Sequence, residues 1–158
     1  MIEARSKRAP RLIFIGASAA GKTTLTQAIL RDELRYRKTQ TIEVAGGMVI
    51  DTPGEYLERG RLRGSLAVAA SEANVIVLLQ SATAQVSYFP PSFASMFAKP
   101  VIGVVTKADA AAPEQIEEAK RRLERAGVTK IFVTSAYKGM GVQEFIDYID
   151  TFSERKVN

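Results

Sequence analysis

The sequence predicts an α/β protein in three layers, with a mainly parallel sheet covered by helices on both faces. Short apolar runs typical of strands alternate along the chain with segments whose apolar residues recur at helical spacing. Near the start, the strand-like run 11–15 leads through a glycine-containing loop into such a helical segment. At 158 residues the chain is long enough for one domain with a substantial core.

The composition narrows the possible chemistry. The chain is 46% hydrophobic and 25% charged, which is ordinary for a soluble globular protein. No apolar run approaches the roughly 20 residues of a membrane-spanning helix. Cysteine is absent, which excludes thiol chemistry and fits a cytoplasmic protein. Histidine is absent too, so any catalysis would depend on carboxylates, hydroxyls, lysines, backbone groups or a bound metal.

The net charge is +5, and basic residues gather at the start of the chain and again after the first expected helix. Residues 1–10 are polar and basic, and we expect a disordered extension followed by one domain over 11–155. A basic surface can attract an anionic nucleotide or an acidic partner. The chain shows no aromatic-plus-basic module, so nucleic acid is not favoured as a partner.

The most informative stretch is Gly16–Thr23, which reads Gly-Ala-Ser-Ala-Ala-Gly-Lys-Thr and matches the phosphate-binding P-loop. Its backbone N–H groups are expected to form an anion-binding nest at the start of a helix that runs to about Glu33. We expect Lys22 to reach the β- and γ-phosphates and Thr23 to bind Mg²⁺. The expected phosphate-binding residues are Gly16, Ala17, Ser18, Ala19, Ala20, Gly21, Lys22, Thr23 and Thr24.

A second motif follows a short apolar run that ends at Ile50. Asp51-Thr-Pro-Gly54 has the form D-x-x-G, and we place it at the carboxyl end of a strand, where ligands bind in open α/β sheets. Asp51 could hold Mg²⁺, and Gly54 could present its N–H to a γ-phosphate. A weak strand is expected at 41–45, and the charged segment 55–64 is expected to be mobile.

The remaining elements follow from periodicity and from turn residues. Strands are expected at 74–80, 100–105 and 130–133, and helices near 62–70, 92–97, 113–126 and 142–152, with an irregular segment at 81–91.

Two further motifs follow apolar strands. Thr106-Lys-Ala-Asp109 resembles the [NT]-K-x-D signature of translation-factor-related GTPases, and Ser135-Ala136 resembles their last base-binding loop. A carboxylate at Asp109 can accept hydrogen bonds from guanine N1–H and the 2-amino group, and adenine has neither donor there. Lys107 would lay its alkyl stem along the base, and the Ala136 N–H would donate to the guanine carbonyl.

With all four motifs in order, residues 11–152 resemble a Ras-like P-loop GTPase. More narrowly the chain is similar to the EutP/PduV family of ethanolamine or propanediol utilisation, which is associated with bacterial microcompartments. The residues that carry this narrower resemblance are Lys38-Thr-Gln40, Ile50-Asp-Thr-Pro-Gly-Glu-Tyr56 and the Thr106–Asp109 motif. It implies a Ras-like fold with a truncated second strand, and GTP or GDP with Mg²⁺ as ligands.

The resemblance also implies a switch I threonine that closes on Mg²⁺, for which Thr39 is the best candidate and Thr41 the alternative. Residues 51–64 would then be switch II. Glu55 stands where Ras-like proteins often carry a water-orienting glutamine, and it is either catalytic or a solvated surface residue. Ala19 replaces an asparagine of potassium-activated relatives, so activation by a bound K⁺ is not expected. The phosphate loop has no arginine, and Arg35, Arg37 and Lys38 near switch I stay open as a source of a finger. Slow hydrolysis is expected if no finger is supplied. The expected catalytic set is Lys22, Thr39, Gly54 and Glu55.

Three functions remain open at this point. The first is a weak GTPase switch, cytoplasmic and on or in a microcompartment. Its basic N-terminus would bind a shell, cytoskeletal or regulatory protein. The second is a P-loop kinase that passes phosphate to a small carboxylic or hydroxylated metabolite, although no lid with clustered arginines is visible. The third is a docking module in which the nucleotide is mainly structural.

Overall fold

The computed structural model describes residues 7–8, 10–36, 49–50, 52, 54–59, 63–152 and 154–155. Its central sheet has five parallel strands in the order β3-β2-β4-β5-β6. These are β2 (Leu12–Ile15), β3 (Val49–Ile50), β4 (Val75–Ser81), β5 (Val101–Thr106) and β6 (Ile131–Val133).

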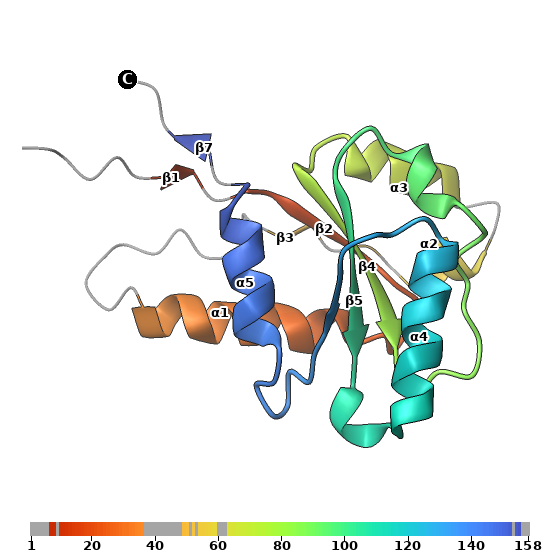
Figure 1. The fold of residues 1–158 in the computed structure, drawn as a ribbon. Coiled ribbons are helices and arrows are strands. Elements are labelled where there is room, and N and C mark those ends of the chain that lie inside the picture. Colours follow the sequence, from red (N-terminus) through yellow and green to blue (C-terminus); the bar gives the residue numbers. More distant parts are fainter. Residues whose placement is uncertain are drawn as a thin grey trace, which may run out of the picture.

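Helices cover both faces of this sheet, with α1 and α5 on one side and α2, α3 and α4 on the other (Figure 1). The helices are α1 (Lys22–Tyr36), α2 (Glu55–Glu58), α3 (Arg63–Ala70), α4 (Pro113–Arg125) and α5 (Val142–Asp150), with 3-10 turns η3 (Phe93–Met96) and η4 (Ala108–Ala110). The predicted three-layer α/β architecture is confirmed. No helix in the described part of the chain is long and apolar enough to cross a membrane.

The side chains of β2 alternate between two apolar layers. Leu12 and Phe14 face the layer formed with α1 and α5, whereas Ile13 and Ile15 face the layer formed with α2, α3 and α4. All four are fully buried, as expected for a parallel strand covered on both sides. The ring of Phe14 lies 6.4 Å from that of Phe145 in α5, and truncating such a buried ring costs about 3–5 kcal/mol.

The order of the strands fixes where a ligand can bind. Strand β2 lies between β3 on one side and β4 on the other, so the chain changes direction across the sheet at β2. Ligands of open α/β sheets bind beyond the carboxyl ends of the strands at such a switch point. The P-loop leaves β2 at this position, and the loops after β4, β5 and β6 end at the same edge of the sheet.

Several elements differ from the sequence-based expectation. Helix α1 continues to Tyr36, so residues 34–36 are helical rather than part of a loop; they contain no glycine or proline that would end the helix. Residues 55–58, in the segment expected to be mobile, form one helical turn, α2, and Leu57 in this turn is buried in the core. The segment 81–91 is irregular beyond the end of β4, as predicted. The strand expected at 41–45 lies outside the described residues.

A small second sheet pairs the two ends of the chain. Strand β1 (Lys7–Arg8) is antiparallel to β7 (Glu154–Arg155). Two residues of the expected N-terminal extension are thus paired in a strand, and the domain boundary at residue 11 stays a prediction. Nearby, the Arg11 N–H donates to Oδ1 of Asn74 at 2.8 Å, at the amino end of the sheet.

Candidate functional site

The P-loop (16–23) leaves β2 and enters α1 through a tight turn. Ala19 and Gly21 both have positive φ, at 64° and 97°. Gly16 is packed so closely that a Cβ there would lie 3.1 Å from the carbonyl oxygen of Leu79. The turn is therefore shaped by the sequence and needs no ligand to explain it.

The turn leaves several backbone donors without partners. Within the described part of the chain, no hydrogen bond is made by the N–H groups of Ala19, Gly21, Thr23 and Thr24. These groups sit at the start of α1, where the helix dipole adds partial positive charge. A row of unpaired donors at a helix N-terminus is the arrangement that binds phosphate groups, so the loop fits a nucleotide phosphate chain.

The Lys22 side chain is engaged by its own loop. Its Nζ donates to the carbonyl oxygen of Gly16 at 2.6 Å. A phosphate group would offer the same ammonium a charged acceptor, which makes a stronger hydrogen bond than a neutral carbonyl. Lys22 is thus in the loop's interior, at the position from which the sequence predicts contact with the β- and γ-phosphates.

The end of β5 fixes the other side of the P-loop. The Thr106 hydroxyl, which is buried, donates to the carbonyl oxygen of Ala20 at 2.6 Å. Lys107 Nζ donates to the carbonyl oxygen of Ala19 at 2.5 Å. Both bonds join segments far apart in sequence, so the two expected halves of a nucleotide site are connected directly.

A pocket opens in front of the P-loop. Its lining combines most of the P-loop with the D-x-x-G segment and the lysine of the T-K-x-D motif. It is lined by Ser18, Ala19, Ala20, Gly21, Lys22, Thr23, Thr24, Thr52, Gly54 and Lys107. We call it the phosphate pocket. Gly16 and Ala17, which are also expected to bind phosphate, lie outside this lining, and their role stays a prediction.

Gly54 touches the P-loop. A Cβ at Gly54 would lie 2.3 Å from the backbone nitrogen of Ser18, so only glycine fits there. Beside it, the buried Thr52 donates its hydroxyl to the carbonyl oxygen of Phe14 at 2.8 Å. The D-x-x-G segment is therefore held against both β2 and the loop that follows it.

Helix α2 makes a second contact with the same loop. The Ser18 N–H donates to Oε1 of Glu58 at 2.6 Å. This bond is the main reason why the pKa of Glu58 is lowered, with the Ser18 hydroxyl and the positive charge of Lys22 adding to the effect. We call this contact the Glu58 latch. It joins switch II, as the resemblance defines it, to the P-loop.

The base-side motifs meet beyond β5 and β6. The Ser135 hydroxyl donates to Oδ1 of Asp109 at 2.7 Å, and the Lys138 N–H donates to the Ser135 oxygen at 3.1 Å. Within the described residues, Oδ2 of Asp109 has no hydrogen-bond partner. The carboxylate is thus oriented on one side and remains available as an acceptor on the other.

A second pocket, the base pocket, lies next to Asp109. It is lined by Gly21, Thr24, Leu25, Thr106, Lys107, Asp109, Thr134, Ala136 and Tyr137. Gly21, Thr24 and Lys107 line this pocket and the phosphate pocket alike. The two pockets therefore form one continuous site, which fits a molecule with an anionic end and a flat, hydrogen-bonding end.

Some predicted site residues cannot be placed. Thr39, Thr41 and Asp51 lie outside the described residues. Glu55 begins α2, but its side chain is not described. Of the three predicted Mg²⁺ ligands, Thr23 is therefore the one whose position is known. Among the described residues, no group of three or more histidine, cysteine or acidic side chains could hold a metal ion.

Sequence reasoning missed three polar residues around the P-loop, namely Thr52, Glu58 and Tyr137. Thr52 lies inside the D-x-x-G motif, where a hydroxyl at the end of a buried strand was a usable signal. Glu58 lies one helical turn after Gly54, but its contact depends on α2 forming at all. Tyr137 follows the Ser-Ala pair and is 83% exposed at the base pocket.

Comparison with known proteins identifies the family. The sequence matches the PduV-EutP family, described as "Ethanolamine utilisation - propanediol utilisation", over residues 9–151. It is 44% identical over 140 residues to the "Propanediol utilization protein PduV" of Citrobacter freundii, which covers 89% of this chain and 93% of the relative. Two proteins named "Probable acetate kinase EutP", from Escherichia coli K12 and Salmonella typhimurium LT2, are 27% and 30% identical, each over 92% of both chains.

Solved structures show the same fold at low identity. The bacterial selenocysteine-specific elongation factor EF-Sec superposes with a TM-score of 0.64 at 20% identity; the match covers 92% of this chain and 28% of the elongation factor. The FeoB G-domain of Methanococcus jannaschii superposes with a TM-score of 0.58 at 21% identity, over 92% of this chain and 97% of that domain. The expected Ras-like P-loop fold is thereby confirmed, and the chain belongs to the PduV-EutP family of ethanolamine and propanediol utilisation proteins.

Proposed function

We propose that this protein binds guanine nucleotides with Mg²⁺ and hydrolyses GTP slowly, as a switch in ethanolamine or propanediol utilisation. The observation that carries the choice of base is the Ser135–Asp109 hydrogen bond of 2.7 Å at the edge of the base pocket. It holds a carboxylate acceptor where guanine N1–H and the 2-amino group would donate. Adenine offers no donor there, so it would forgo hydrogen bonds to a charged group, each of which contributes about 1.5–3 kcal/mol.

The roles on the phosphate side rest on the unpaired donors of the P-loop. The N–H groups of Ala19, Gly21 and Thr23 would donate hydrogen bonds to phosphate oxygens, and Lys22 would exchange the carbonyl of Gly16 for the β- and γ-phosphates. Thr23 would bind Mg²⁺ together with Thr39 and Asp51. The metal would supply charge stabilisation for phosphoryl transfer.

Slow turnover follows from what the site lacks. No arginine lines the described phosphate pocket, and Ala19 offers no side chain to hold a monovalent cation. Gly54 would present its N–H to the γ-phosphate, and Glu55 would orient the attacking water. A GTPase without an arginine finger hydrolyses at about 10⁻³ to 10⁻⁴ per second, so the product of the reaction is a conformational state rather than a metabolic flux.

Nucleotide selectivity tests this proposal. Fluorescent GDP and ADP are titrated into the full chain with and without Mg²⁺. GDP is expected to bind at least about tenfold more tightly, because one hydrogen bond to a charged group corresponds to roughly that factor. Equal affinity for the two nucleotides would reject guanine selectivity.

A second candidate is a P-loop kinase that transfers phosphate to a small carboxylic acid. The names of the EutP relatives support it, since both carry the words "probable acetate kinase". Incubation of the protein with γ-labelled ATP or GTP and acetate tests it. A labelled product that depends on acetate supports the kinase, whereas release of phosphate alone supports the GTPase.

The place of action is part of the same proposal. The protein would be cytoplasmic, on or in a microcompartment, with its basic N-terminal segment binding a shell, cytoskeletal or regulatory protein. Removal of residues 1–10 should abolish localisation and leave nucleotide affinity intact. Unchanged localisation of the shortened chain would rule out docking by this segment.

A further inference from the structure

A third pocket adjoins the phosphate pocket, and the two share Ser18, Ala19, Ala20 and Lys107 in their linings. It is a cavity of about 200 Å³ between the P-loop, α2 and the loop that joins β4 to η3. It is lined by Ala17, Ser18, Ala19, Ala20, Leu57, Leu79, Gln80, Ser81, Thr83, Ala84, Val86, Tyr88, Phe89 and Lys107. We call it the rear pocket. Drug-sized ligands occupy about 300–1,000 Å³, so this cavity suits a smaller molecule.

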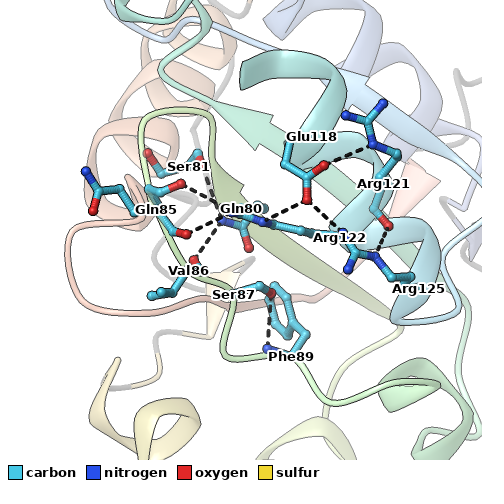
Figure 2. Close-up of polar contacts among 11 residues, drawn as sticks. Gln80, Ser81, Gln85, Val86, Ser87, Phe89, Glu118, Arg121, Arg122 and Arg125 are labelled. Atoms are coloured by element: carbon cyan, nitrogen blue, oxygen red, sulfur yellow. Dashed lines mark hydrogen bonds and ion pairs between the residues drawn. The ribbon is translucent and has the colours of Figure 1, made fainter. Parts of the chain in front are cut away.

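The wall of the rear pocket is a long loop that is held in place. Arg122 reaches from α4 and donates to the carbonyl oxygens of Ala84 and Gln85 at 2.8 and 2.9 Å (Figure 2). The ring of Phe89 packs against that of Phe93 at 5.6 Å. Long loops inside compact domains usually have a function, and here two separate anchors fix the loop's shape.

Gln80 gives the rear pocket its polar centre. It stands at the end of β4 with only 4% of its surface exposed. Its Nε2 donates to the carbonyl oxygens of Ser81 and Val86 at 3.2 and 3.4 Å (Figure 2). Because both partners are acceptors, the amide nitrogen must face them and the amide oxygen must face away.

The amide oxygen of Gln80 is therefore an unused acceptor. Within the described residues this oxygen has no hydrogen-bond partner. No fully buried side-chain nitrogen or oxygen of those residues lacks a partner, so the Gln80 oxygen is not fully buried. The oxygen consequently keeps contact with open space, and Gln80 lines the rear pocket. An almost buried acceptor of this kind gains free energy when a ligand donates a hydrogen bond to it.

A donor stands beside this acceptor. The hydroxyls of Ser81 and Thr83 share one hydrogen bond of 2.9 Å, and the Thr83 N–H also donates to Ser81 Oγ. The two hydroxyls carry one hydrogen each, and their mutual hydrogen bond uses one of them. The other hydrogen remains available to donate to a ligand. The rest of the lining is mainly apolar, and Lys107 is its one charged side chain among the residues that form it.

We propose that the rear pocket binds a small neutral vicinal diol. One hydroxyl donates to the amide oxygen of Gln80 and the other accepts from the Ser81–Thr83 pair, while the carbon chain packs against Leu57 and Val86. An ionised carboxylate has only acceptors and would face the Gln80 oxygen with lone pairs. A primary ammonium would face the positive charge of Lys107. The proposal goes beyond the proposed nucleotide-dependent function and does not depend on it.

Solution NMR of the nucleotide-free full chain, labelled with ¹⁵N, tests the proposal. The protein is titrated with propane-1,2-diol, with ethanolamine and with acetate. We expect saturable shifts of the Gln80 side-chain amide and of the Ser81 and Thr83 backbone amides, at the lowest concentration for the diol. Absence of saturable shifts at these groups, or tighter binding of acetate or ethanolamine, would overturn the proposal. Failure of the nucleotide titration would leave this result unaffected.

Matched variants localise the binding. Gln80→Leu removes the acceptor, and Val86→Phe fills the pocket from a position that is 55% exposed, so it tests the site even if the first variant does not fold. Gln80→Leu should weaken diol binding by about tenfold, the value of one hydrogen bond, and Val86→Phe should weaken it at least as much because the ring occupies the space of the ligand. Gln85→Leu is the control, since Gln85 lies on the same loop but does not line the pocket. Unchanged diol affinity in Val86→Phe would contradict the assignment.

Discussion

The two halves of the nucleotide site differ in how far they are formed before a nucleotide arrives. On the base side, Ser135 already orients Asp109, and Thr106 is bonded to the P-loop. On the phosphate side, the groups that would meet the γ-phosphate are occupied by the protein itself: Lys22 by a carbonyl and Ser18 by Glu58. The base half is thus preorganised, whereas the phosphate half must exchange internal bonds for ligand bonds.

This difference suggests how a switch could work. A diphosphate can use the preorganised base half and the unpaired N–H groups at the start of α1. A γ-phosphate would in addition approach Gly54, which packs against Ser18, and would thereby act on α2. A ligand shifts a conformational equilibrium only by its differential affinity for the two states. The contacts between α2 and the P-loop are where that difference would arise.

Replacing Lys22 tests the phosphate half most strongly. Lys22→Ala should weaken binding of both GDP and GTP by about a hundredfold, because loss of a charged partner to phosphate costs roughly 2–5 kcal/mol. Fluorescent nucleotide titration measures the change. Lys120→Ala is the control, since Lys120 is a half-buried residue of α4 that pairs with Glu117 and lines neither pocket of the nucleotide site. Near-normal affinity in Lys22→Ala would mean that the phosphates do not bind at this loop.

Replacing Asp109 tests the base half. Asp109→Asn exchanges an acceptor for a donor and should shift preference from guanine to xanthine nucleotides by about tenfold to a hundredfold. Competition between GDP and XDP measures the shift. Asp147→Asn in α5 is a matched change at an exposed aspartate bonded to Gln143, and it should leave selectivity as it is. If Asp109→Asn preferred GDP over XDP as strongly as the parent protein does, the base contact would not be made by Asp109.

A methyl group at Gly54 tests the packing between the D-x-x-G segment and the P-loop. Gly54→Ala would place a carbon 2.3 Å from the Ser18 nitrogen, so the D-x-x-G segment must move off the P-loop. We expect the free energy of unfolding to fall by about 1–3 kcal/mol in denaturant titrations, the usual cost of overpacking. Gly64→Ala in α3 meets nothing within 4 Å and should be neutral or stabilising. Equal stability of the two variants would show that the close contact is not maintained in solution.

The smallest effect is expected at the Glu58 latch. The pKa of Glu58 is lower in the folded protein than its ordinary value of 4.5. The Glu58 latch therefore contributes its full stabilisation at pH values above 4.5. This contribution is lost as the pH falls through the lowered pKa. Glu58→Gln should reduce stability slightly at neutral pH and raise affinity for GTP by a few-fold. The stability difference should vanish in acid. Glu72→Gln, at an exposed residue beyond α3, is the control. A difference that persists unchanged in acid would exclude ionisation of Glu58 as its cause.

The sequence predicted the fold and the position of the base-side residues well, and for a physical reason. Asp109 and Ser135 follow apolar strands directly, and the carboxyl ends of parallel strands meet at one edge, so neighbouring motifs had to converge. The P-loop was predictable for the same reason. The parallel sheet and its two covered faces followed from the alternation of apolar runs with amphipathic helices. The strand order was not predicted.

The contacts around the P-loop were not predictable in the same way. The Glu58 latch requires a helical turn in a charged segment that looked mobile, and Leu57 stabilises that turn through core packing that no local pattern reveals. Gln80 ends a strand that read as wholly apolar, so its buried polar role was not expected. The positions of Thr39, Asp51 and the Glu55 side chain lie outside the described residues and stay predictions.

The small sheet of β1 and β7 has a consequence for attachment. This small sheet lies at the amino edge of the main sheet, because β1 precedes β2 and β7 follows α5. The phosphate, base and rear pockets open at or beside the opposite, carboxyl edge. A partner that bound the basic residues near the start of the chain would therefore contact the side of the domain opposite the candidate nucleotide site. Tethered in this way, the molecule would point its binding face outward, free to exchange small molecules while its opposite side stays fixed.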